Sequence, residues 1–114
     1  MSDSAKALQI LAAHLAKQDH TYRPDVYLLI EERAAPAIAT WEKTIEPVSV
    51  DRSLPLTVAF IDLIPSANYE HPVQYAFIDE MSGNIEIVEA TTPPNALTTD
   101  FRKVEIDIPA SGQR

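Results

Sequence analysis

The side chains best suited to chemistry gather in residues 68–72, a polar stretch between two apolar ones. His71 exchanges protons near neutral pH and carries ring nitrogens that bind metals. Asn68, Tyr69 and Glu70 add hydrogen-bonding groups beside it, and functional residues concentrate on loops that a rigid scaffold positions. We take these four residues as the candidate binding segment, although Asn and a His-Pro pair also form ordinary turns, and that structural role is the favoured one.

Two carboxylates form a second candidate site. Asp62 and Asp79 each end the same string, Ala-Phe-Ile-Asp, which occurs at 59–62 and again at 76–79. If the two strings are neighbouring strands, Asp62 and Asp79 form a paired-carboxylate acid/base site or a hard-cation site, and His71 completes a speculative catalytic set. No calcium-loop pattern is present, so solvated strand-end or turn roles for these acids are favoured.

The composition argues against several kinds of site. The two glycines do not form a phosphate loop, a dinucleotide loop or a Gly-x-Ser-x-Gly elbow. Because the chain has no cysteine, it has no disulfide, thiolate metal site or cysteine nucleophile. His14 and His20 lack the spacing of a helical zinc site. We expect no metal and no cofactor, and the sequence favours a binding protein over an enzyme.

Charge is distributed unevenly along the chain. Nine basic and seventeen acidic residues give a net charge of −8, which repels nucleic-acid phosphates and anionic lipid headgroups. Residues 53–101 contain no Lys or Arg but seven acidic residues. We therefore expect a protein partner with a basic surface, and neither nucleic acid nor a membrane.

The N-terminal segment predicts an amphipathic helix at residues 4–19. Leu8, Leu11 and Leu15 recur at three- and four-residue spacing, which places them on one face. A short polar side chain among residues 2–4 is expected to cap the first turn, because its oxygen accepts from the unpaired amides there.

The next segments are less regular. Residues 26–30 are read as a strand, although neighbouring residues also suit a helix. Ile38, Trp41 and Ile45 have helical spacing after a proline, which predicts a short helix that Pro47 ends. Trp41 is then expected to be a core or groove-lining aromatic residue.

The second half has the composition of strands. Strands are predicted at 56–64, 73–79, 84–90 and 102–108, where apolar residues run continuously or alternate with polar ones. Gly83 is expected to turn a hairpin between the second and third of these strands, since glycine adopts a positive φ at little cost.

The predicted fold class is α+β, with the N-terminal helix packed on an antiparallel sheet of about four strands. One domain is expected over residues 1–114, with 1–3 and 110–114 frayed. The chain shows no signal peptide and no apolar run of membrane-spanning length, which favours the cytoplasm and leaves the compartment open.

Residues 74–88 resemble a hairpin of PepSY-type modules and peptidase propeptides. The string Gln-Tyr-Ala-Phe-Ile-Asp-Glu-Met-Ser-Gly-Asn-Ile-Glu-Ile-Val is similar to their Tyr/Val-x-Val-Asp-x-x-x-Gly-x-Ile pattern. The resemblance implies a non-catalytic module that binds or restrains a peptidase partner, and it assigns no functional residue. The loop at 65–72 has no counterpart in that pattern.

Three functions remain open from the sequence. The first is a non-catalytic protein-interaction module, an accessory or propeptide-like domain that binds, masks or chaperones a larger partner. The second is a small enzyme or ligand-binding domain that uses the loop from Asn68 to His71. The third is a self-associating structural protein whose open sheet edges pair with a second copy, giving a homo-oligomer.

Overall fold

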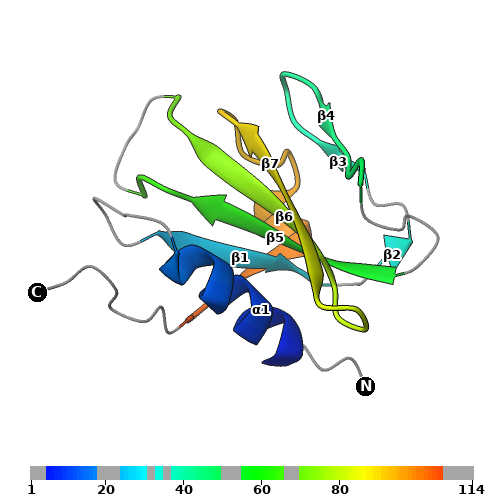
Figure 1. The fold of residues 1–114 in the computed structure, drawn as a ribbon. Coiled ribbons are helices and arrows are strands. Elements are labelled where there is room, and N and C mark those ends of the chain that lie inside the picture. The colour runs from blue at the N-terminus through cyan, green and yellow to red at the C-terminus, as the bar shows by residue number, and fades with distance from the viewer. Residues whose placement is uncertain are drawn as a thin grey trace, which may run out of the picture.

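The protein is a helix packed on an antiparallel sheet (Figure 1). The computed structural model describes residues 5–17, 24–30, 33–34, 37–49, 55–65 and 70–106. The elements are α1 (Ala5–Ala16), β1 (Asp25–Leu29), β2 (Arg33–Ala34), β3 (Ile38–Ala39), β4 (Thr44–Ile45), β5 (Pro55–Asp62), β6 (Val73–Asp79), β7 (Asn84–Ala90), α2 (Leu97–Asp100) and β8 (Phe101–Val104).

The strand order of the main sheet is β7-β6-β5-β1-β8, and β2 pairs with the start of β5. The predicted α+β class is confirmed, and the main path has one strand more than the four or so expected. The additional strand is β1, where the sequence favoured a strand only weakly. The predicted frayed ends and the capping residues at 2–4 lie outside the described residues.

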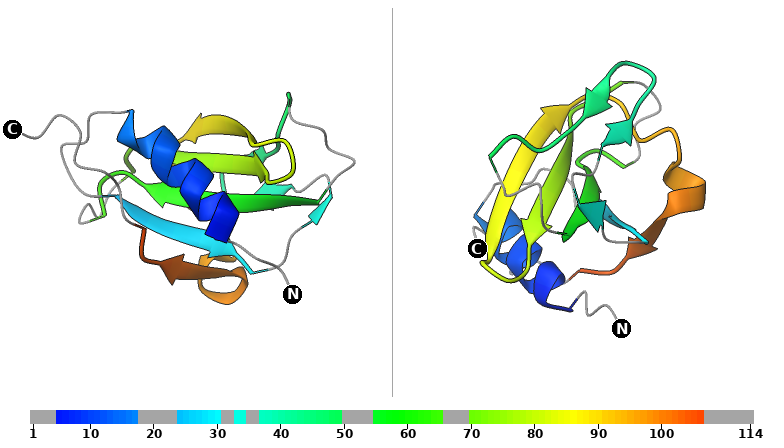
Figure 2. Two further views of the ribbon diagram at one scale, coloured as in Figure 1. Left: turned by 60° about the horizontal axis from the view of Figure 1, so that its bottom comes forward. Right: turned by 90° about the vertical axis from the view of Figure 1, so that its right-hand side faces the viewer.

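Helix α1 covers one face of the sheet (Figure 2). Leu11 and Leu15, two of the three predicted leucines, are fully buried, while Leu8 is half-buried at the margin of the same cluster. Glu80, from the turn between β6 and β7, accepts a 3.0 Å hydrogen bond from the Ala7 amide. A carboxylate at this end complements the unpaired amides and the positive end of the helix dipole.

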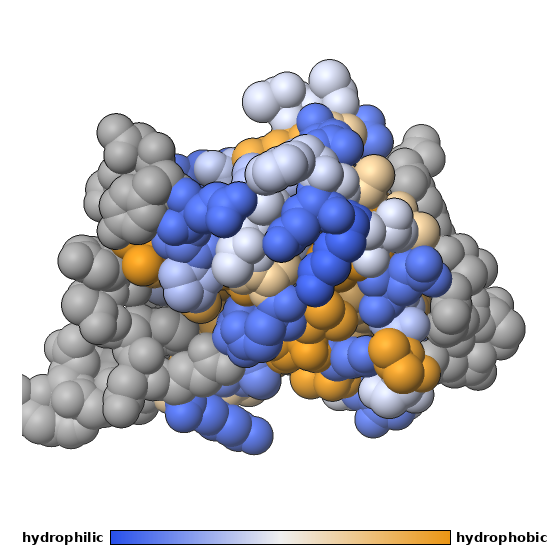
Figure 3. Space-filling view, turned by 90° about the horizontal axis from the view of Figure 1, so that it is seen from above, coloured by the Kyte–Doolittle hydropathy of each residue, from blue (hydrophilic) through white to orange (hydrophobic). Residues whose placement is uncertain are grey.

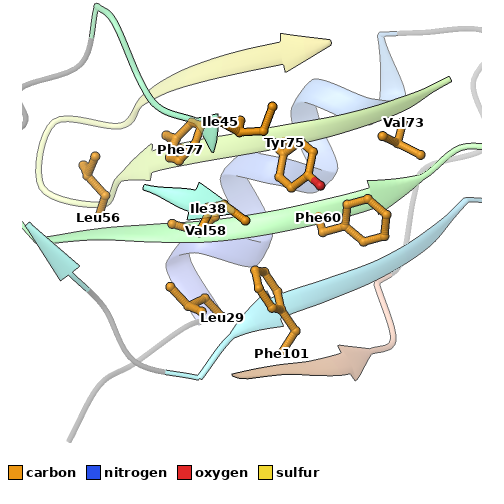
Figure 4. Packing of buried hydrophobic residues seen from close by; sticks show 10 residues of the cluster. All are labelled: Leu29, Ile38, Ile45, Leu56, Val58, Phe60, Val73, Tyr75, Phe77 and Phe101. Carbon is orange, nitrogen blue, oxygen red and sulfur yellow. The ribbon is translucent and has the colours of Figure 1, made fainter. Parts of the chain in front are cut away.

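The opposite face carries a row of aromatic side chains (Figure 4). Tyr27, Phe60 and Tyr75 are direct cross-strand partners on β1, β5 and β6. Their ring centroids are 5.8 Å and 5.2 Å apart in tilted arrangements, which aromatic pairs favour. The buried cluster on this face comprises Leu29, Ile38, Ile45, Leu56, Val58, Phe60, Val73, Tyr75, Phe77 and Phe101.

The two Ala-Phe-Ile-Asp strings are adjacent, as the sequence predicted. Ala59 of β5 lies opposite Ala76 of β6, and both are fully buried under α1. The predicted hairpin is also confirmed, since Gly83 has a φ of 81° in the turn between β6 and β7. All seven residues of β6 are buried, so both faces of this strand are covered by the two core clusters.

The predicted short helix around Trp41 is wrong, because this segment is the two-stranded hairpin β3–β4. Ile38 and Ile45 are cross-strand partners, and both are buried against the aromatic face of the sheet. Spacing suited to one face of a helix also fits two strand residues that face each other across a four-residue turn. Trp41 lies in that turn and is 75% exposed, so the prediction of a core residue is wrong as well.

The C-terminal strand begins one residue earlier than predicted. β8 covers Phe101–Val104 and pairs with β1, and the one-turn helix α2 precedes it. The end predicted for this strand, residues 107–108, lies outside the described residues. None of the described helices is long and apolar enough to cross a bilayer.

Candidate functional site

The fold brings together two of the three residues of the speculative catalytic set. Asp62 ends β5, and His71 lies just before β6, which is the neighbouring strand. His71 Nε2 is 2.6 Å from Asp62 Oδ1, and the two side chains are 13% and 21% exposed. Since a carboxylate only accepts, the imidazole donates this bond. The same Asp62 oxygen also accepts a 3.1 Å hydrogen bond from the Ile64 amide.

A second acid and a second base stand beside this pair. Asp25 of β1 lies directly opposite Asp62 of β5 in the strand register. Asp25 Oδ2 is 3.4 Å from Lys103 Nζ, which belongs to β8. Two carboxylates opposite each other on one face repel, so each basic partner offsets part of that repulsion. No sequence pattern pointed to Asp25 or Lys103, because only the strand register brings them here.

Asp79, the third member of the speculative set, lies at the other end of β6 and has a structural role. Its Oδ1 accepts from the amides of Met81 and Ser82, and its Oδ2 accepts from the Ser82 hydroxyl at 2.9 Å. These bonds stabilise the turn before Gly83, as Asp side chains commonly do. The turn role that the sequence favoured for these acids is therefore the one Asp79 has, and the alternative pairing with Asp62 does not form because antiparallel neighbours place the two string ends apart.

The predicted binding loop is only partly visible. Asn68 and Tyr69 lie outside the described residues, whereas Glu70 is exposed and His71 is mostly buried. Among the described ranges, no group of three or more His, Cys, Asp or Glu side chains has an arrangement that would hold a metal. The pair of Asp62 and His71 can orient an imidazole for acid–base chemistry, and it also ties the end of the loop to β5.

The tip of the β3–β4 hairpin forms a different kind of site, which the sequence reasoning missed. Thr40 organises the turn: its hydroxyl donates to the Lys43 carbonyl at 2.6 Å and accepts from the Glu42 and Lys43 amides. The Thr40 amide also donates to the Lys43 carbonyl. The turn is thereby closed by four hydrogen bonds, and it presents Trp41 to solvent. The signal available in the sequence was the Thr-Trp-Glu-Lys string between two isoleucines.

Carboxylates connect this hairpin to β7. Thr91, the residue after β7, donates to Glu42 Oε1 at 3.3 Å. Glu86 of β7 accepts from the amides of Val48 and Ser49, which follow β4, at 2.7–2.9 Å.

Figure 3 shows the protein from above relative to Figure 1. On this face hydrophilic residues cover most of the described surface, with smaller hydrophobic areas between them.

A cavity of about 160 Å³ lies between the hairpin and α2. Its lining is mainly apolar and includes Leu29, Ile38 and Phe101, with Asn95 and Asp100 as polar members. The volume falls below the range of roughly 300–1,000 Å³ in which drug-sized ligands bind. We therefore do not assign a ligand to it.

The comparisons with known proteins identify no relative. No protein-family model, no curated protein and no solved structure matches the chain. The resemblance to PepSY-type modules therefore stays a prediction from one hairpin, and the functional argument rests on this chain's own residues.

Proposed function

We propose that the protein is a non-catalytic interaction module that binds a basic surface of a protein partner through the β3–β4 hairpin tip. The observation that carries this proposal is Trp41, whose side chain is 75% exposed on a turn closed by hydrogen bonds. The isoleucines at the base of the same hairpin are buried. Trp41 is thus held on a fixed support and contributes little to the core.

An exposed tryptophan on a fixed turn suits protein recognition. Tryptophan is enriched among the residues that dominate interface energies, because it buries a large area for little loss of side-chain freedom. Its ring face also attracts Lys and Arg side chains through cation–π interactions. A preformed turn lowers the ordering cost of binding.

The charges around the tip support a basic partner. Glu42 and Glu46 are exposed on or beside the hairpin, and Glu86 lies beneath the segment that follows it. Lys43 is the one basic residue in the turn. The local balance is therefore negative, and it continues into the stretch from 53 to 101 that has no Lys or Arg. Such a surface speeds encounter with a cationic partner and makes binding sensitive to salt.

Site-specific photo-crosslinking tests the proposal. A photoreactive aromatic amino acid, which keeps a ring at the tip, replaces Trp41 in one variant and Ala13, an exposed residue of α1, in the control variant. In extract of the expressing cells we expect position 41 to crosslink one protein through a segment rich in Lys or Arg, and position 13 not to do so. The yield should fall severalfold between about 0.02 M and about 0.5 M salt. Equal crosslinking at both positions, or no crosslinking at low salt, contradicts the proposal.

A second candidate function rests on the 2.6 Å contact between His71 and Asp62. We propose as the alternative that this pair binds a small ligand or transfers a proton at the loop beside β6. A small-molecule screen followed through the His71 ring signals in NMR tests it. Ligands that shift these signals in the native protein, and not in an Asp62→Asn variant, support the alternative. A screen without such ligands assigns the pair to loop anchoring.

A further inference from the structure

Strand β7 is the long open edge of the sheet. It spans seven residues, each paired with a residue of β6, and among the described residues no strand pairs with its other side. At such an edge every second residue turns its N–H and C=O outward. The opposite edge, β8, has four residues. β7 therefore offers the longer row of backbone donors and acceptors.

We propose that an extended segment of the partner protein, which carries both Lys or Arg and apolar residues, adds to β7 as a further strand. This inference rests on the proposed function and names the form of the partner. In strand addition the backbone hydrogen bonds supply affinity, and alternate side chains supply specificity on the two faces of the sheet.

The charges of β7 indicate a basic strand. Glu86 lies on the hairpin face and Glu89 on the α1 face, since side chains of a strand alternate. Glu86 is held by backbone amides, and Glu89 accepts from Gln74 Nε2 at 3.0 Å. Both carboxylates are thus fixed beside the open edge. A cross-strand pair of opposite charges is favourable, whereas like charges facing each other are not.

The apolar residues of β7 indicate that the added strand also carries apolar side chains. Ile85, Ile87 and Val88 are only half-buried although they belong to the margins of the two core clusters. A strand added beside them would cover their outer sides with its own apolar side chains. The partner sequence expected from β7 therefore mixes basic and apolar residues.

Trp41 lies next to the end of this edge. Thr91 directly follows β7, and its hydroxyl contacts the carboxylate of Glu42, which is the neighbour of Trp41. The partner strand would pass from the β7 edge to the hairpin tip, where Trp41 can stack on its last basic side chain. The hydrogen bond from Thr91 to Glu42 places the hairpin turn that carries Trp41 beside the end of the open edge.

A second copy of this chain suits the edge less well. Each copy carries a net charge of −8, and two acidic β7 strands would lie side by side. Among the strand side chains that the structure describes, the basic ones are Arg102 and Lys103, both in β8. This strand is short and is followed by Glu105. We therefore assign β7 to a separate basic protein.

The test uses a basic synthetic peptide as long as β7, made of Val with two Lys residues three positions apart, so that the two Lys side chains fall on opposite faces as Glu86 and Glu89 do. One control peptide has Glu in place of both Lys residues, and a second is the basic peptide with alternate amides N-methylated, which keeps the charge but removes strand pairing. We expect the basic peptide to bind and to slow hydrogen exchange of alternate β7 amides in NMR. The N-methylated peptide should bind about tenfold more weakly, which corresponds to losing one or two net hydrogen bonds.

The outcomes separate this inference from the proposed function. Equal binding of the basic and N-methylated peptides, or protection at amides outside β7, overturns strand addition, while salt-sensitive crosslinking from position 41 would still uphold the interaction module. Binding of the acidic peptide as tightly as the basic one overturns the charge argument. Concentration-dependent dimers in light scattering that the basic peptide does not dissociate overturn the assignment to a separate partner.

Discussion

Ile38 and Ile45 face each other across the β3–β4 hairpin and are only 5% and 1% exposed. Both belong to the cluster that contains Phe60, Tyr75 and Phe77 on the aromatic face of the sheet. The hairpin is therefore fixed in the core at its base. Its turn extends beyond the core, and this difference is why Trp41 is available to a partner.

Trp41 provides its own test of this arrangement, because it is the only tryptophan in the chain. We expect the native protein to emit fluorescence close to the wavelength of the urea-unfolded chain and to be quenched by acrylamide nearly as efficiently. A strongly blue-shifted, shielded emission would mean that the ring is buried and would remove the basis of the proposed surface.

The Thr40→Ala substitution should loosen the turn that carries Trp41. The Thr40 hydroxyl makes three hydrogen bonds within this turn, and removing it should lower the free energy of unfolding by about 1 kcal/mol. Thr44→Ala, an exposed position of the same hairpin, is the matched control and should change it by less than about 0.5 kcal/mol. Urea denaturation measures both values. Equal effects of the two substitutions would contradict the role of the Thr40 hydroxyl in closing the turn.

The contact between Asp62 and His71 should be coupled energetically to Asp25. Replacing His71 with Ala leaves Asp62 facing Asp25, and we expect a loss of about 1 kcal/mol of unfolding free energy. Asp25→Asn in that background should recover about 0.5 kcal/mol by removing the like charge. Lys103→Gln, which affects only the more exposed pair, is the control and should cost less than about 0.5 kcal/mol. A double-mutant cycle without coupling between His71 and Asp25 would refute this account.

Tyr75 should make the protein sensitive to alkali. Burial raises the pKa of Tyr75 above its ordinary value of 10.0, and its hydroxyl donates to the Thr92 carbonyl at 2.7 Å. Above pH 10 the unfolded chain releases this proton while the native protein retains it, so the unfolded state binds fewer protons and stability falls as pH rises. This contribution is fully present at neutral pH.

The Tyr75→Phe substitution isolates that effect. At pH 7 we expect it to lower the free energy of unfolding by about 1 kcal/mol, because the buried Thr92 carbonyl loses its donor. Above pH 10 the variant should lose stability less steeply than the original protein in urea denaturation. Parallel pH profiles for the two proteins would show that Tyr75 ionisation does not drive the alkaline loss.

The sequence predicted the elements whose patterns have one interpretation. The leucines of α1 and the alternating residues of β7 identified these elements, and Gly83 identified the turn between β6 and β7. The segment around Trp41 was ambiguous, because isoleucines seven residues apart fit one face of a helix as well as a cross-strand pair. The burial of both Ile38 and Ile45 in the core favours the hairpin over the helix.

The candidate site was only half predictable for a similar reason. Asp62 and His71 are close in the chain, so a short loop between adjacent strands brings them together. The contribution of Asp25 depends on the register of β1 against β5, which the sequence alone does not determine. Asp79 carries the same local string as Asp62, but the antiparallel direction places it at the opposite end of the sheet.

A titration of the protein with the basic Val–Lys peptide, followed through the fluorescence of Trp41, tests the central claim most directly. We predict a saturable blue shift at about 0.02 M salt that is largely lost at about 0.5 M, because the contact is electrostatic and covers the ring. Peptide binding that calorimetry detects without any change in Trp41 emission would contradict the account.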